Sequence, residues 1–343
     1  MNAMLAWWED SCRSSRTVRF VDVNLRSVGQ VMFQNNPLTG ALFLAAIAWG
    51  SLASGSPQIF LCGLLAVVVA TLTAIWLRVQ DESLNAGLLG YNSILVGLAL
   101  ATFLAPGPLL WLYVILGAVV SVIVTLGISN AVKAWGLTAL TFPFVLTTWL
   151  LLLGTYGFAG LNGAALPAGR VIAPFVPYAA PSFDLLDVGK GVLLSVSQVF
   201  LKGSGVSAVL FIAGLAVNSV PAALFALGGA LLAVLTAHVL GAESDLVTAG
   251  LLGFSPVLTA ILLGTVAYNP SFRVVVYAAI GVVFTVVAQA ALNVALTPFA
   301  VPALTAPFVI VSWLFLLPRQ CLEEASVPPD EPLSKGRGDE VAA

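Results

Sequence analysis

Long segments without charged residues alternate along the chain with short segments that contain them. The uncharged segments cover residues 38–77, 83–132, 134–169, 203–242, 246–272 and 274–318. A helix needs about 20 apolar residues to cross a hydrocarbon core about 30 Å thick, so the longest segments hold at least two crossings each. No alternation with a period of two suggests a membrane barrel, whereas helices satisfy their own backbone groups in lipid. The pattern predicts an all-α polytopic membrane protein.

The composition supports this prediction, since 60% of the 343 residues are hydrophobic and only 8% are charged. Soluble chains carry roughly 25% charged residues, so water cannot face most of this surface. The formal net charge of −2 gives no reason to expect nucleic acid as a partner. The three cysteines lie far apart and indicate neither a disulfide framework nor a metal site. We expect no cofactor.

Three blocks of sequence occur twice in the same order. The pairs are 27–31 with 195–199, 85–91 with 248–254, and 140–149 with 304–313. They share a Gln, a Gly-x-x-Gly motif, and a Leu-Thr-x-Pro-Phe motif followed by Trp. A Leu-rich composition does not produce three collinear matches of this kind, so the two halves are duplicates.

The two halves are predicted to be inverted repeats. If each half crosses the membrane five times, an odd number, the second half enters it in the opposite orientation. Such repeats form pores or carriers with a site near the membrane midplane. Short segments that turn back at Gly90 and Gly253 add a re-entrant element to each half. The predicted fold is two inverted repeats, each of five transmembrane helices plus one re-entrant half-helix.

The charged and polar segments define the predicted divisions of the chain. These are a cytoplasmic N-terminal segment at 1–23, a first membrane repeat at 24–155, an extramembrane linker at 156–189, a second membrane repeat at 190–318, and a disordered cytoplasmic tail at 319–343. Acidic residues interrupt the N-terminal segment, which therefore does not read as a signal peptide. The tail is rich in Pro, Glu, Lys and Gly.

Polar side chains within the apolar segments are the functional candidates. Gln30 and Gln198 occupy equivalent positions, and Gln30 shares a helix face with Phe33. Each Gln either binds a solute or bonds to a neighbouring helix. Thr141 and Thr305 precede a Pro by two residues, and Pro leaves a carbonyl without its helical donor. Their hydroxyls either line a pathway or bond within their own helix.

These candidates are uncharged, which favours a neutral solute. An ion would need a compensating charge or a ring of carbonyls. Lys202 and His238 are interpreted as residues near helix breaks or ends, and His238 has no counterpart in the first half. The membrane segments contain no Ser/His/Asp set and no pair of carboxylates, so we do not expect an enzyme. Amides and hydroxyls beside flat apolar side chains suit a planar molecule rich in N–H groups.

The longer motifs resemble the bacterial and animal urea transporter family. The resemblance covers about residues 24–317, and its motifs are Asn-Pro-Leu-Thr-Gly at 36–40, Gly-Leu-Leu-Gly-Tyr-Asn-Ser-Ile-Leu-Val-Gly at 87–97, and the paired Leu-Thr-x-Pro-Phe segments. It implies ten membrane spans with two re-entrant helices, and a homotrimer with one pore in each subunit. It also implies passive, channel-like transport of urea by a multi-pass protein among the lipids of the plasma membrane, which in bacteria is the inner membrane.

The resemblance also implies a set of substrate-binding residues. They are Gln30, Phe33, Tyr91, Leu95, Thr141, Gln198, Leu201, Phe254, Leu258 and Thr305. The two Gln residues lie at two binding sites, the two Thr residues lie on a ladder of oxygen acceptors, and the others form plates that flank the solute. The second half departs from the first at Leu201, where the first half has Phe33, and at Ser255-Pro256, where it has Asn92-Ser93.

Other transport classes stay open at this point. A channel for another small neutral solute or for ammonia, and an ion-coupled carrier, are the alternatives. Water and glycerol channels carry two Asn-Pro-Ala motifs, whereas this chain has only Asn36-Pro37-Leu38. An ammonium channel needs paired pore histidines, and His238 is the only histidine. A coupled carrier needs a titrating group inside the membrane, and the acidic residues lie at predicted span ends.

Overall fold

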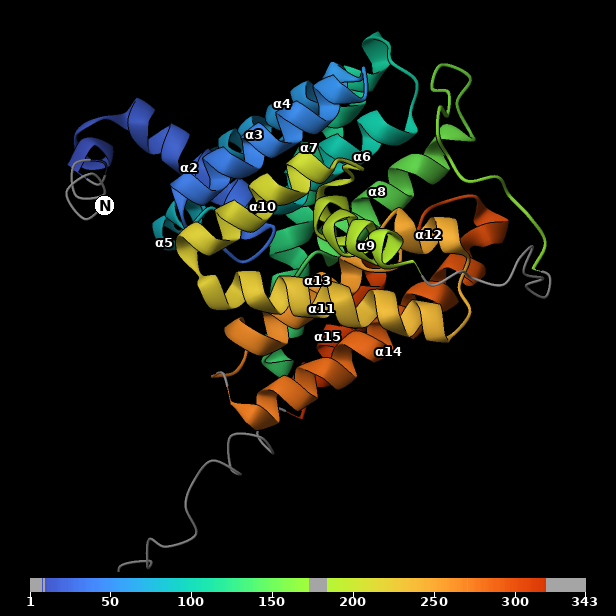
Figure 1. Cartoon of the computed structure of the whole chain (residues 1–343). Coiled ribbons are helices and arrows are strands. Elements are labelled where there is room, and N and C mark those ends of the chain that lie inside the picture. Colours follow the sequence, from blue (N-terminus) through green and yellow to red (C-terminus); the bar gives the residue numbers. More distant parts are fainter. Residues whose placement is uncertain (1–7, 9, 173–183, 270, 319–343) are drawn as a thin grey trace, which may run out of the picture.

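The regular structure of the chain is helical (Figure 1), in a computed structural model that describes residues 8, 10–172, 184–269 and 271–318. The first half contains α2 (Arg16–Gln30), α3 (Pro37–Ala53), α4 (Pro57–Trp76), α5 (Asp81–Asn85), α6 (Tyr91–Phe103), α7 (Pro108–Val132), η1 (Lys133–Trp135) and α8 (Phe142–Thr155). The second half contains α9 (Leu185–Ser197), η2 (Gln198–Phe200), α10 (Gly205–Asn218), α11 (Val220–Val239), α12 (Ser244–Thr248), α13 (Phe254–Ile261), η3 (Leu262–Val266), α14 (Phe272–Leu296), η4 (Thr297–Phe299) and α15 (Ala306–Leu316). The prediction of an all-α protein is confirmed.

Three pairs of corresponding helices in the two halves have equal lengths. Helices α4 and α11 have 20 residues each, and α7 and α14 have 25 residues each. The short helices α5 and α12 have 5 residues each. The halves differ at α13, which continues into the π-helical turn η3, whereas its counterpart α6 is a regular helix of 13 residues. The order of the helices and the lengths of these three pairs thus repeat in the way that the sequence blocks indicate.

Among the described residues, four helical segments are long and apolar enough to cross a membrane. They are Pro57–Trp76, Pro108–Trp135, Val220–Val239 and Phe272–Phe299. A fifth is added if the pair formed by α9 with η2 and α10, bent by 74°, is one span. Only 39% to 44% of these apolar windows is buried in the protein, so the helices expose a large apolar surface, as membrane-spanning helices do. The chain is a polytopic membrane protein.

The sequence predicts five spans in each half, which is more than the four or five spans that helix length and composition support over all the described residues. Five further apolar helices, such as α6 and α8, have only 10–17 residues, which is shorter than a straight crossing of about 20 residues. A short helix within the membrane needs protein or water at its ends to satisfy its backbone. The number of spans and the inversion of the halves therefore stay predictions.

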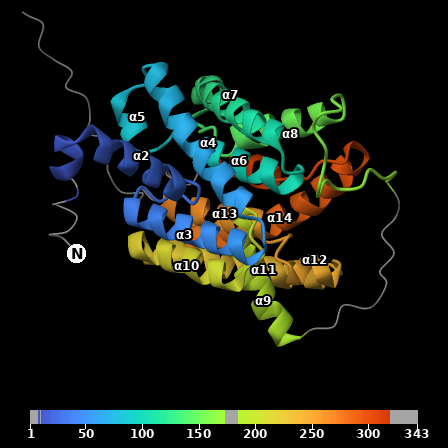
Figure 2. The same cartoon turned by 90° about the horizontal axis from the view of Figure 1, so that it is seen from above.

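The two halves contact each other through α3 and α10, which lie side by side (Figures 1 and 2). The Thr39 hydroxyl donates to the Gly214 carbonyl at 2.8 Å. In the opposite direction, the Ser207 hydroxyl donates to the Ala46 carbonyl at 2.7 Å. Ser207 is the repeat counterpart of Thr39, and Gly214 is the counterpart of Ala46, each at an offset of 168 residues. Reciprocal contacts of this type are those of two units related by a twofold axis.

Two Trp residues repeat this reciprocal arrangement. The Trp149 indole donates to the Pro302 carbonyl at 2.8 Å, and the Trp313 indole donates to the Thr138 carbonyl at 2.9 Å. Both residues of the second pair lie 164 positions from their counterparts. Each indole therefore ties its own helix, α8 or α15, to the segment that precedes the other helix.

One pair of contacts between the halves is not symmetric. The Asn218 amide in α10 donates to Gln34 Oε1 at 2.7 Å. The counterparts of Asn218 and Gln34, at the same offset of 168, are Gly50 and Lys202. Lys202 is 3% exposed, and its Cδ would lie 3.0 Å from a Cβ added to Gly50. The aliphatic stem of Lys202 thus fills the space left by the absent side chain at Gly50.

Aromatic rings pack at the centre of this contact. The rings of Phe200 and Phe211 stack with centroids 4.6 Å apart, and Phe43 from the other half meets Phe211 edge-on at 5.3 Å. All three side chains are fully buried. The core is therefore shared by the two halves, which form one packed unit.

The described residues bear on only part of the predicted divisions. Helix α2 runs without a break past residues 23 and 24, where we placed the start of the first repeat. The tail at 319–343 and residues 173–183 of the linker lie outside the described residues. The linker at 156–172 is irregular, and the Asn162 carbonyl accepts a bond from Ala105 N at 2.8 Å.

Candidate functional site

The Gly-x-x-Gly motifs place two short helices against the helices that carry the candidate Gln residues. Gly87 has a φ of +73°, and a Cβ there would collide with the Ser27 backbone nitrogen. Gly250 has the same φ of +73°, and a Cβ there would collide with the Ser195 backbone nitrogen. Only Gly accepts both this φ and this close approach, which explains why the motif occurs in both halves.

This packing brings each Gln to a backbone carbonyl. Gln30 Nε2 donates to the Ala86 carbonyl at 2.8 Å, and Gln198 Nε2 donates to the Ala249 carbonyl at 3.2 Å. Within the described part of the chain, neither Gln Oε1 accepts a hydrogen bond. Each Gln thus bonds to a neighbouring segment, and because only its nitrogen is used, its Oε1 stays available as an acceptor.

The helix breaks within three residues of each Gln. Phe33 and Leu201 have positive φ values of 63° and 55°, and each donates its backbone N–H to the carbonyl of the Gln three residues earlier. The Phe33 ring meets the Phe308 ring edge-on, with centroids 6.1 Å apart. Leu201 lines a cavity together with Phe144, the repeat counterpart of Phe308. The residue after each helix break thus faces the Pro-Phe segment of the other half.

The Leu-Thr-x-Pro-Phe motifs meet at the boundary between the halves. Leu140 and Leu304 have positive φ values of 49° and 51°, and each precedes the Thr that begins α8 or α15. The hydroxyls of Thr141 and Thr305 lie 2.7 Å apart and form a hydrogen bond. Both residues are buried, at 2% and 3% exposure. The two predicted ladder residues therefore contact each other directly rather than bonding only within their own helices.

Side chains of α6 hold the break before α8 in the first half. The Tyr91 hydroxyl donates to the Leu140 carbonyl at 2.7 Å. Asn92 Nδ2 lies 3.3 Å from the same carbonyl, and Asn92 Oδ1 accepts from Phe144 N at 3.2 Å. The groups that the helix start leaves unpaired are thus satisfied by neighbouring side chains.

The second half has a different arrangement at the equivalent place. Phe254 stands where Tyr91 stands in the first half and has no hydroxyl, and Ser255 stands where Asn92 stands. The Ser255 hydroxyl donates to Gln289 Oε1 at 2.7 Å, and Gln289 Nε2 donates to Asn293 Oδ1 at 3.1 Å. Ser255 therefore bonds to polar groups of α14, and not to the segment before α15 in the way that Asn92 bonds to the segment before α8.

A cavity of about 390 Å³ lies on the second-half side of the Thr pair. It is lined by Phe103, Phe144, Pro167, Ala168, Gln198, Val199, Leu201, Leu246, Leu251, Phe254, Gln289, Asn293, Thr297, Val301, Pro302, Ala303, Leu304 and Thr305. None of these described residues carries a charge. Four of the predicted site residues, all from the second half, are thus brought together around one uncharged chamber.

The other predicted residues lie outside this lining. Leu95 and Leu258 are fully buried in the core, and they pack within the cluster that both halves share. Gln30, Phe33 and Tyr91 belong to the first-half side, and Thr141 reaches the chamber only through its bond to the lining residue Thr305. Lys202 is buried at the contact between α3 and α10 and does not line the chamber.

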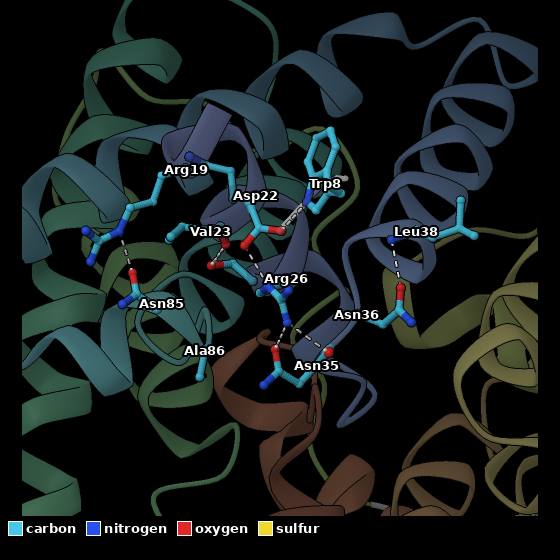
Figure 3. Close-up of polar contacts among 12 residues, drawn as sticks. Trp8, Arg19, Asp22, Val23, Arg26, Asn35, Asn36, Leu38, Asn85 and Ala86 are labelled. Carbon is cyan, nitrogen blue, oxygen red and sulfur yellow. Dashed lines mark hydrogen bonds and ion pairs between the residues drawn. The ribbon is translucent and has the colours of Figure 1, made fainter. Parts of the chain in front are cut away.

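A polar basin of about 930 Å³ opens on the first-half side. Ala86, whose carbonyl binds Gln30, lines this basin. Arg26 spans its edge, because its Nε donates to Asp22 at 2.7 Å and its Nη1 donates to the Asn35 side chain at 2.9 Å (Figure 3). Charged groups therefore line this basin and are absent from the described lining of the chamber.

Reasoning from the sequence missed several residues of the chamber. Gln289 and Asn293 stand four residues apart in an apolar segment, so their isolated polarity was a usable signal. Phe144 and Phe308 belong to the repeated Pro-Phe motif, but their contact with the opposite half depends on the tertiary arrangement. No local pattern indicates that the linker residues Pro167 and Ala168 cover the chamber.

Comparison with known proteins agrees with these features. A sequence model described as urea transporter matches residues 21–320. Urea transporter 1 of Ovis aries is 27% identical over 320 residues, which cover 92% of this chain and 81% of that protein. Urea transporter 1 of Rattus norvegicus is 28% identical over 305 residues, which cover 88% of this chain and 77% of that protein. The match extends across both halves and all of the candidate site, and the chain belongs to the urea transporter family, whose members are transport proteins and not enzymes.

Proposed function

We propose that the protein conducts urea across the membrane by passive, channel-like diffusion through a selective pore in each subunit. The observation that carries this proposal is the chamber of about 390 Å³, whose described lining holds amides, two hydroxyls and apolar side chains but no charge. Urea is neutral and planar, and it carries four N–H donors, so it needs acceptors rather than a counter-charge. Membership of the urea transporter family supports urea as the solute.

The proposed pathway uses acceptors from both halves. In the second half, Gln198 Oε1 is free to accept a hydrogen bond, and the Thr305 hydroxyl follows at the boundary with Thr141. In the first half, Gln30 Oε1 is free in the same way. A solute that passes from one Gln to the other exchanges the bond between the two hydroxyls for bonds to itself, so the loss of water is compensated in steps.

Apolar side chains supply the walls in this proposal. The proposed plates are Phe33, Tyr91, Leu95, Leu201, Phe254 and Leu258, which act beside the acceptors Gln30, Gln198, Thr141 and Thr305. Such walls do not replace the hydration of a bulky polyol, so shape and hydrogen bonding together select a flat amide. Leu95 and Leu258 are fully buried in the structure, so in this proposal they support the walls from behind the side chains that contact the solute.

We further propose inverted halves, a homotrimer and a plasma membrane location, which in a bacterium is the inner membrane. The reciprocal contacts between α3 and α10 support a twofold relation of the halves. An axis within the membrane plane would turn this relation into the inverted topology of many transporters. Chemical crosslinking in native membranes and cysteine labelling from each side test the assembly and the orientation.

The test of function is uptake of labelled urea into proteoliposomes, with and without imposed proton and sodium gradients. Passive transport predicts equilibration to the external concentration under every condition, and the described chamber lining holds no charged side chain that could couple urea to a proton. Accumulation above that concentration would instead identify an ion-coupled carrier. Glycerol and ammonia are the comparison solutes, and permeability to either that equals urea would replace urea selectivity with a broader neutral channel.

A further inference from the structure

The backbone carbonyls of Leu140 and Leu304 occupy equivalent positions in the two halves but differ in their hydrogen bonding. Leu140 and Leu304 are repeat counterparts with φ values of 49° and 51°, and each lies directly before the Thr of the central pair. Their carbonyls therefore occupy equivalent positions about the boundary between the halves. Any difference in what binds them comes from the side chains of α6 and α13.

The Leu140 carbonyl is occupied by the protein itself. It accepts from the Tyr91 hydroxyl at 2.7 Å and from Asn92 Nδ2 at 3.3 Å. A carbonyl oxygen has two lone pairs, so these two donors leave it no capacity for a strong further bond.

The Leu304 carbonyl accepts no hydrogen bond from the part of the chain that the structure describes. Phe254 has no hydroxyl to donate, and the Ser255 hydroxyl is directed to Gln289 Oε1 at 2.7 Å. Leu304 lines the chamber of about 390 Å³, together with Gln198 and Thr305. A buried carbonyl is normally paired with protein or water, so this one is available to a molecule in the chamber.

We propose that the Leu304 carbonyl is a binding group for an N–H donor of the solute, and that the Tyr91 hydroxyl masks the equivalent group in the first half. The pathway is then functionally asymmetric, with its stronger binding site in the second-half chamber. Two positions set this asymmetry, Tyr91 against Phe254 and Asn92 against Ser255. The inference rests on the proposed transport of urea and assigns the site at which urea binds more tightly.

The test exchanges the two side chains between the halves. Phe254→Tyr adds a hydroxyl at the place that corresponds to Tyr91, where it donates to the Leu304 carbonyl. The half-saturating urea concentration for flux should rise by roughly threefold to tenfold, the effect of losing one neutral hydrogen bond. Tyr91→Phe exposes a lone pair of the Leu140 carbonyl, so the half-saturating concentration should fall.

The opposite directions of the two changes separate masking from simple obstruction. Tyr113→Phe is the matched control, because the Tyr113 hydroxyl also donates to a carbonyl, that of Leu151 at 2.8 Å, away from the chamber lining. This control should leave the half-saturating concentration unchanged. Thermal unfolding of each purified variant shows whether it is folded.

Unchanged half-saturation in both reciprocal variants, or a rise in both, would overturn the inference while leaving urea transport intact. Wild-type protein that conducts no urea would instead overturn the proposed function, and with it the inference. A Phe254→Tyr, Ser255→Asn double variant provides a second arm, because it rebuilds both donors of the first half. It should raise the half-saturating concentration at least as far as Phe254→Tyr alone.

Discussion

The hydroxyl oxygens of Thr141 and Thr305 lie 2.7 Å apart, although 164 residues separate them in the chain. They are counterparts in the two halves, and each begins the helix that follows a backbone break, α8 or α15. A bond between two counterparts means that both lie beside the approximate twofold axis that relates the halves. In the proposed pathway this bond is the one that the solute must exchange.

Removal of one central hydroxyl should slow urea without unfolding the protein. Thr305→Val keeps the shape of the side chain but leaves no oxygen for the solute, at a cost of about 0.5–1.5 kcal/mol for one hydrogen bond. Urea flux should therefore fall roughly twofold to tenfold in proteoliposomes. Thr305→Ser keeps the hydroxyl and serves as the control, and a Ser variant as slow as the Val variant would argue against the role of the oxygen.

Replacement of both Gln30 and Gln198 should reduce urea flux more than removal of the Thr305 hydroxyl. Gln30→Leu and Gln198→Leu each remove an unoccupied Oε1 acceptor and also the bond to Ala86 or Ala249. A desolvated solute left without a partner loses about 1–3 kcal/mol, so each variant should reduce flux several-fold. Stopped-flow measurement of urea exit from vesicles checks this. Normal flux in a folded double variant would contradict the assignment of both sites.

The Gly-x-x-Gly packing should be sensitive to a single methyl group. Gly250→Ala introduces a Cβ that meets backbone atoms of Leu194 and Ser195, and φ is +73° at this position. Gly241 has the same φ of +73° but no heavy atom within 4 Å, so Gly241→Ala reports the backbone strain alone. We expect about 1 kcal/mol of destabilisation for Gly241→Ala.

Gly250→Ala should be clearly more destabilising and should also displace the Ala249 carbonyl from Gln198. Thermal unfolding in detergent compares the two variants, and urea flux at a temperature where both are folded gives the second measurement. Equal melting temperatures and equal fluxes would show that the close approach of α12 to α9 is not required.

Gly50 and Lys202 differ from their repeat counterparts, Asn218 and Gln34, and we expect that replacing both with the counterpart side chains is tolerated better than replacing either alone. Gly50→Asn alone places a side chain where the Lys202 stem lies, and Lys202→Gln alone removes that stem without filling the space. The double variant rebuilds the Asn218 to Gln34 bond of the other side, which is 2.7 Å long. Each single variant should lower the melting temperature, and the double variant should recover most of the loss, with a coupling of about 0.5–3 kcal/mol.

The duplicated positions were accessible from the sequence because each lies in a short motif with a local cause. Gly87 and Gly250 are required by a positive φ and a close contact, and this requirement leaves the same letters in both halves. The pairing of Ser255 with Gln289 left no such trace, since the two residues belong to different helices and 34 positions separate them. The burial of Lys202 likewise depends on the space beside Gly50, which belongs to another helix.

By itself the sequence determined the membrane class, the helical content and the duplication, because hydrophobic runs and repeated motifs are local properties that need no knowledge of the fold. It also determined which polar residues stand in equivalent places. Only the tertiary structure decided which of their atoms are free. The carbonyl of Leu140 is covered by Tyr91 and that of Leu304 is not, and this difference arises where α6 or α13 meets the start of another helix. Hydrogen-bonding capacity is a property of contacts between distant segments, so it becomes visible only when those segments are in place.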